Sequence, residues 1–146
     1  MEPLPTHGEQ IAAFIAAFED GTLPKARWTH GAHILTGAWY VHGLGREAAI
    51  GRMREAVRRY NLAVGGKNTA AGGYHETITV FWIKLLAALQ QGMEPMERHA
   101  FASVAVERFG DARRLHEAFY TFDVMASEQA RREWMEPERP LDTANL

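Results

Sequence analysis

Apolar residues recur at helical spacing over most of the chain, and glycine, proline or capping residues interrupt the pattern between runs. The first run places Ile11, Phe14, Ile15 and Phe18 on one face. The periodicity predicts seven helical segments: residues 6–20, 29–42, 46–63, 75–91, 95–110, 111–125 and 127–134. No convincing strand pattern competes with them. We therefore expect an all-α fold, a bundle of six or seven helices in a single domain over residues 1–146, with residues 136–146 as an extended tail.

Capping residues sharpen several of these boundaries. Thr6 and Glu9 have the spacing of a capping box at the first helix, and Thr29 and Ser127 are suitable N-caps for the second and last helices. Gly73 is the expected N-cap of the fourth helix, which would put Glu76 at its third position. There a glutamate complements the helix dipole, so Glu76 has a structural explanation besides any chemical one.

Composition narrows the classes of function. The 146 residues include 16 Lys and Arg against 18 Asp and Glu, a formal net charge of −2, so charge gives no reason to expect a nucleic acid or an anionic membrane as partner. The chain has no cysteine, which leaves His, carboxylates and water as metal ligands. The N-terminus lacks the pattern of a secretion signal, and no apolar run reaches the ~18 residues that cross a bilayer. We expect a cytoplasmic protein.

Two histidines stand at the start of the second helix, in the stretch WTHGAHILTGAWY. At about 100° per residue, His30, His33, Gly37 and Tyr40 share one strip of this helix. The other directions are covered by apolar side chains, so these histidines should be at least partly buried. Burial favours the neutral imidazole, the form that binds metals.

The fourth helix presents a similar strip, on which His75 aligns with Thr79, Trp82 and Leu86. Metal sites in helical bundles are assembled from facing helices, and a His pair on one helix joined by a His from another is a workable geometry. Glu76 is the fourth candidate ligand, although it lies about 100° around the helix from His75. A bare cation is disfavoured near two helix N-termini, whereas an anionic ligand is favoured there.

The other histidines and the glycine-rich stretch are weaker candidates for a functional site. His99 and His116 fall off the apolar stripes of their predicted helices and are expected to be exposed. The glycine-rich stretch VGGKNTAAGGYHET lacks the spacing of a phosphate-binding loop, and we interpret it as a flexible flap over the histidine site. The sequence shows no recognisable catalytic triad of serine, histidine and an acidic residue for nucleophilic catalysis.

Three segments, WTHGAHI at 28–34, GYHETITVFW at 73–82 and SEQARREWMEP at 127–137, occur in this order along the chain. Together they resemble a group of small, uncharacterised bacterial helical proteins that share an aromatic-x-His-x-x-His segment and a Gly-Tyr-His-Glu-Thr-x-Thr segment. The resemblance implies the domain boundaries and the pairing of the two histidine segments, but no reaction. By position it implies that His30, His33, His75 and Glu76 belong together, with Tyr74 and Thr79 as neighbours.

The sequence thus leads to a first hypothesis of a small metalloprotein, an enzyme acting on a small molecule. His30, His33, His75 and Glu76 would bind a divalent transition metal (Zn, Fe, Mn, Ni or Cu), and Glu76 and Tyr74 are the candidate catalytic residues. The alternatives are a metal-free module that binds a small anionic or aromatic ligand, and a structural protein whose histidines belong to the core. A homodimer through an apolar helix face is plausible in each case.

Overall fold

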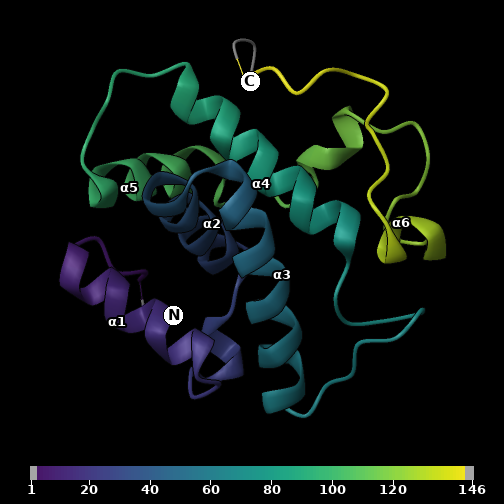
Figure 1. Cartoon of the computed structure of the whole chain (residues 1–146), viewed down its shortest axis with the longest axis horizontal. Coiled ribbons are helices and arrows are strands. Elements are labelled where there is room, and N and C mark those ends of the chain that lie inside the picture. The colour runs from purple at the N-terminus through teal and green to yellow at the C-terminus, as the bar shows by residue number, and fades with distance from the viewer. Residues whose placement is uncertain (1–2, 144–146) are drawn as a thin grey trace.

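The computed structural model describes residues 3–143 and is all-α. Its helices are α1 (Gly8–Glu19), α2 (His30–Leu44), α3 (Arg46–Ala63), α4 (Glu76–Gln91), α5 (Arg98–Phe109) and α6 (Glu128–Arg132), with 3₁₀ turns η1 (Lys25–Arg27) and η2 (Leu115–Ala118) (Figure 1). These residues contain no strand, which confirms the predicted all-α class. None of the helices in the described part is long and apolar enough to cross a membrane.

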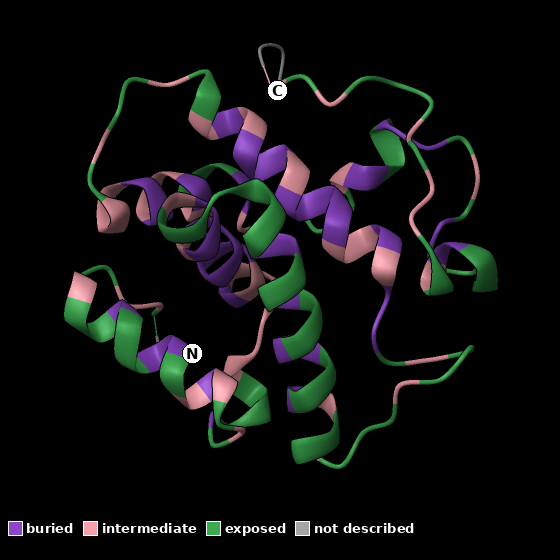
Figure 2. Ribbon diagram, in the orientation of Figure 1, coloured by how far each residue is buried: buried purple, intermediate pink, exposed green. Residues whose placement is uncertain are grey.

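Helix α2 forms the centre of the fold. It packs against α3, α4 and α5, and most of its ribbon is buried in Figure 2. Its sequence, HGAHILTGAWYVHGL, contains no Asp, Glu, Lys or Arg, so it can be surrounded by other helices without burying a formal charge. The burial expected from its all-round apolar character is confirmed for most of the helix.

The helices around α2 are amphipathic. On α3, Met53, Val57 and Tyr60 are buried, whereas Arg54, Arg58 and the other arginines are exposed, which gives the two-sided burial seen in Figure 2. The bounds of α3 are those predicted, because Gly45 precedes it and the apolar stripe stops at Ala63.

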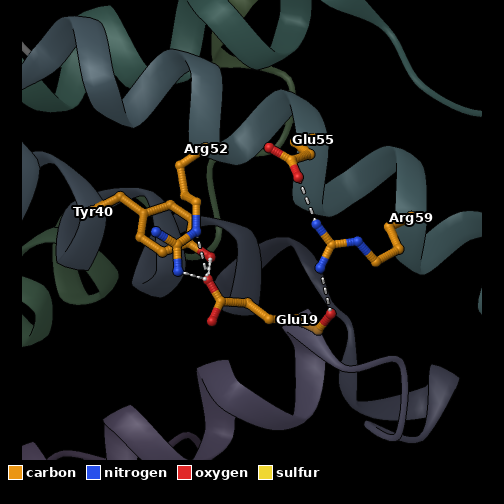
Figure 3. A network of polar contacts seen from close by, with 5 residues as sticks. All are labelled: Glu19, Tyr40, Arg52, Glu55 and Arg59. Carbon is orange, nitrogen blue, oxygen red and sulfur yellow. Dashed lines mark hydrogen bonds and ion pairs between the residues drawn. The ribbon is translucent and has the colours of Figure 1, made fainter.

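A polar network joins the end of α1 to α2 and α3 (Figure 3). The Glu19 carboxylate accepts hydrogen bonds from the Tyr40 hydroxyl at 2.6 Å and from Arg52 Nε at 2.9 Å, while Arg59 donates to the Glu19 carbonyl oxygen at 3.2 Å. Burial, followed by the Glu19 carboxylate, raises the pKa of Tyr40, so its hydroxyl remains a donor at neutral pH. The network fixes α1 against the bundle.

Two N-cap predictions are confirmed and two are wrong. Thr29 Oγ1 accepts from the Ala32 N–H, and Ser127 Oγ accepts from the Ala130 N–H, as expected of N-caps. Helix α1, however, begins at Gly8 with His7 as its N-cap and no side-chain capping bond, so Thr6 lies one residue too early for a capping box with Glu9.

The N-cap of α4 is His75 rather than Gly73. The helix begins at Glu76, and His75 Nδ1 accepts the Ile78 N–H at 3.2 Å. Glu76 is therefore the first helical residue and not the third. The prediction failed because a histidine ring can fill the role of the usual Ser, Thr, Asp or Asn, which rules based on those residues do not consider.

The predicted sixth helix over residues 111–125 is absent. Only the short turn η2 forms there, and the segment instead pairs with the C-terminal tail: the Phe119 carbonyl accepts from the Glu138 and Arg139 N–H groups, and the Tyr120 hydroxyl donates to the Met135 carbonyl. Because no helix forms there, Met125, which a helix over residues 111–125 would direct toward the core together with Phe119 and Phe122, is instead 48% exposed. Residues 136–143 of the predicted tail are non-helical, and residues 144–146 lie outside the described part.

Candidate functional site

A large cavity lies between the start of α2, helix α4 and the irregular segment that follows α5. Its volume is about 870 Å³, within the range of small-molecule sites. Its aromatic and histidine lining consists of Trp28, His30, His33, Trp82, His116, Tyr120 and Phe122. We call this space the outer cavity.

His30 reaches the outer cavity from the first turn of α2. Its Nε2 lies 3.0 Å from the Phe109 carbonyl oxygen, and its ring meets Trp82 edge-on with ring centroids 5.0 Å apart. A carbonyl can only accept, so Nε2 carries the proton in this contact. Burial lowers the pKa of His30, which keeps the ring neutral at pH 7.

His33 lies one turn further along α2, with its ring 4.1 Å from that of Trp28. Trp28 in turn stacks on Phe18 at 3.9 Å, so the position of the imidazole is set by packing. Burial, followed by the neighbouring charge of His30, lowers the pKa of His33 to about 3. Within residues 3–143, neither of its ring nitrogens has a hydrogen-bond partner.

His116 lines the same cavity, although its predicted position was at the surface. It is 8% exposed, and its Nδ1 has no hydrogen-bond partner among the described residues. Burial lowers its pKa. The prediction was wrong because it assumed a helix over residues 111–125, and no local pattern around His116 indicates the turn that forms instead.

Both ring nitrogens of His75 already have hydrogen-bond contacts with the backbone. Its Nδ1 caps α4 through the Ile78 N–H, and its Nε2 lies 2.9 Å from the Val124 carbonyl oxygen. The hydrogen-bond pattern assigns the proton to Nε2. Both ring nitrogens are thus engaged with backbone, and burial lowers the pKa of the ring.

Glu76 is directed toward α3. Arg54 binds its two carboxylate oxygens at 2.9 and 2.7 Å, and the Tyr74 hydroxyl donates to Oε1 at 2.6 Å. Burial acts to raise the pKa of Glu76, but the bonds from Arg54 and Tyr74 outweigh it, so the net shift is downward. Burial also raises the pKa of Tyr74, which therefore stays protonated as the donor.

The predicted site residues have different hydrogen-bond partners. His30 and His33 line the outer cavity, His75 is bonded to backbone groups, and Glu76 is bonded to Tyr74 and to Arg54 of α3. His33, Tyr74 and His75 also line a second, smaller cavity. Across residues 3–143, no three His, Asp or Glu side chains form a group that could hold a metal ion. The divalent-metal site and the catalytic roles of Glu76 and Tyr74 stay predictions.

The charges at the rim of the outer cavity balance. Arg113 and Arg114 face Glu117 and Asp123, and Arg114 pairs with Glu117 at 2.8 Å. Since the three histidines are neutral at pH 7, the cavity carries no net formal charge from its lining.

A smaller cavity of about 290 Å³ lies deeper, between α2, α3 and α4. We call it the inner cavity. Its walls are mainly apolar and include Gly37, Met53, Val57, Ile83 and Leu86. Trp28, His33, Ile78 and Trp82 line both cavities, so these four side chains form the junction between them.

The glycine-rich stretch closes the inner cavity at one end, through Gly73 and Tyr74. Asn68 organises it: its Oδ1 accepts from the Tyr74 N–H and from Asn61 Nδ2, and its Nδ2 donates to the Arg58 carbonyl. Gly73 adopts a φ of +84°, where a Cβ would overlap the Lys67 carbonyl oxygen. Tight hydrogen bonding thus holds the stretch that we interpreted as a flexible flap.

We expect Gly73→Ala to lower the free energy of unfolding by about 2 kcal/mol, because a left-handed conformation costs an L-residue about 1–2 kcal/mol and the new methyl group also meets Lys67. Urea denaturation measures the change. Gly72→Ala is the matched control, since a Cβ there meets nothing within 4 Å. Equal stability of the two variants would contradict the observed loop geometry.

Comparisons with models of protein families, with curated proteins and with solved structures find no match to this chain. The resemblance to the bacterial helical group therefore stays a prediction, and the arguments for function rest on the geometry of the two cavities.

Proposed function

We propose that the protein is a metal-free binding module whose outer cavity takes a planar aromatic small molecule with hydrogen-bonding groups. One observation carries the proposal: a cavity walled by aromatic rings is lined by two imidazoles with unused hydrogen-bonding capacity. The buried Nδ1 of His116 has no partner in the described part of the chain, and the ring of His33, which is only partly buried, forms no hydrogen bond there. Buried polar groups are nearly always hydrogen-bonded, so a ligand that supplies the missing partners would be stabilised there.

The charge state of the histidines that line the outer cavity favours a ligand whose buried part is neutral. Lowered pKa values keep His30, His33 and His116 uncharged at pH 7, so none of the three rings offers ionic attraction. The His30 N–H is used by the Phe109 carbonyl, which leaves its Nδ1 as an acceptor. A pKa of about 3 also makes His33 a weak base. This favours binding over proton transfer, because an effective general base has a pKa near the working pH.

Benzimidazole, a planar ring with one donor and one acceptor, is a suitable probe. We expect calorimetric titration in the presence of EDTA to show saturable binding, and His116→Leu to weaken it at least tenfold by removing a hydrogen-bonding group from the cavity. His99→Leu is the control, since that side chain is 44% exposed and lies outside the lining. No binding to the wild-type protein would contradict the proposal.

The metal content of the same samples distinguishes the metal-free proposal from the metalloprotein hypothesis. Elemental analysis of untagged protein should find no stoichiometric transition metal. One equivalent of a metal that is lost in His33→Ala would instead support the metal site and overturn the metal-free proposal.

A further inference from the structure

We infer that the inner cavity is a binding site for an apolar ring of the same ligand, which would then consist of a hydrogen-bonding heteroaromatic group joined to an aromatic hydrocarbon group. The inference rests on the proposed function of the outer cavity. It adds a second compartment and therefore a narrower class of ligand.

The size and walls of the inner cavity support this assignment. A cavity of about 150 Å³ lined by apolar side chains is large enough for benzene, and the inner cavity has about 290 Å³. Its far wall is formed by Met53, Val57, Ile83 and Leu86. On the α2 side Gly37 allows the apolar side chains of α4 to approach the backbone closely, since a Cβ there would lie 2.9 Å from Leu86 Cδ1.

The junction explains why one ligand would occupy both cavities. Trp28, His33 and Ile78 are each only partly buried, and all three line both spaces. His33 thus presents its unpartnered nitrogens where a heteroaromatic group in the outer cavity would adjoin an apolar ring in the inner one. Trp28 and Trp82 supply aromatic surface at the same constriction.

The polar groups of the inner cavity are largely engaged, which favours an apolar occupant. Asn61 Nδ2 donates to Asn68, the Tyr74 hydroxyl donates to Glu76, and both ring nitrogens of His75 are bonded to backbone. An apolar ring would therefore displace few hydrogen bonds from this compartment.

Two probes test the inference: benzimidazole, which has only the heteroaromatic group, and 2-phenylbenzimidazole, which adds an apolar ring. We expect 2-phenylbenzimidazole to bind the wild-type protein at least tenfold more tightly, because its phenyl group is removed from water. Val57→Phe, which fills the inner cavity, should abolish this difference while changing the affinity for benzimidazole less than twofold.

Nuclear Overhauser contacts provide a readout that does not depend on a variant. The phenyl protons should contact the methyl groups of Met53 and Leu86; contacts confined to Tyr120 and Phe122 would overturn the inference. Equal affinity of the wild-type protein for both probes would also overturn it while leaving the proposed function intact. Failure of both probes to bind would instead contradict the proposed function.

Discussion

His75→Ala should lower the free energy of unfolding by about 3 kcal/mol. The substitution removes the N-cap of α4, which costs about 1 kcal/mol, and leaves the carbonyl of buried Val124 without its donor, which costs about 1–3 kcal/mol. Loss of the buried ring adds to these terms. Urea denaturation at pH 7.5, where the ring is neutral, measures the change.

His75→Asn is the matched variant. Asparagine is a good N-cap and can accept the Ile78 N–H, but its shorter side chain does not reach Val124 as the imidazole does. We expect it to recover about 1 kcal/mol of the loss. If His75 acted through a bound metal, treating the wild-type protein with EDTA would reproduce most of the loss; our geometry predicts that EDTA has no effect.

Acidification should destabilise the protein from pH 6.5 downward, well before its carboxylates are neutralised. Burial lowers the pKa values of His30, His33, His75 and His116, so the unfolded chain binds protons at pH values where the folded chain does not. The stability from neutral histidines is complete above pH 6.5 and is lost as the pH falls toward the folded pKa values. For His33, with a pKa of about 3, the loss between pH 7 and pH 5 is about 2 kcal/mol.

Urea denaturation at pH 7 and pH 5 tests this expectation. In His33→Phe the loss should be smaller by about 2 kcal/mol, because the group that titrates is gone while a ring remains against Trp28. His99→Phe, at an exposed site, serves as the control and should behave as the wild-type protein does. A loss in His33→Phe as large as that of the wild-type protein would contradict the enclosure of His33.

Much of the fold follows from local pattern. The limits of α3, the capping roles of Thr29 and Ser127 and the burial of α2 were all predictable, because helical periodicity and capping depend on residues within about one turn of each other. The same periodicity predicted that His30 and His33 are at least partly buried, which the structure confirms, and burial lowers the pKa values of both rings.

The arrangement of the candidate site residues was harder to predict from the sequence than the helices were. Sequence reasoning grouped His75 and Glu76 with the α2 histidines and placed His116 at the surface. In the structure His75 is bonded to Val124 and lines the inner cavity together with His33, Glu76 is bonded to Arg54, and His116 lines the outer cavity. The positions of these three side chains depend on residues distant in the sequence. Helical periodicity describes only neighbours on one helix and therefore could not predict them.

By itself, therefore, the sequence determined six of the seven predicted helices, the apolar helix α2 among them, and the partial burial of the histidines at the start of α2. Only the tertiary structure decided which polar groups face one another. The His75 bond to Val124 joins residues 49 positions apart, and the His30 contact with Phe109 joins residues 79 apart. Such pairs form only when packing brings the segments together, and the same packing leaves His33 and His116 facing an open cavity.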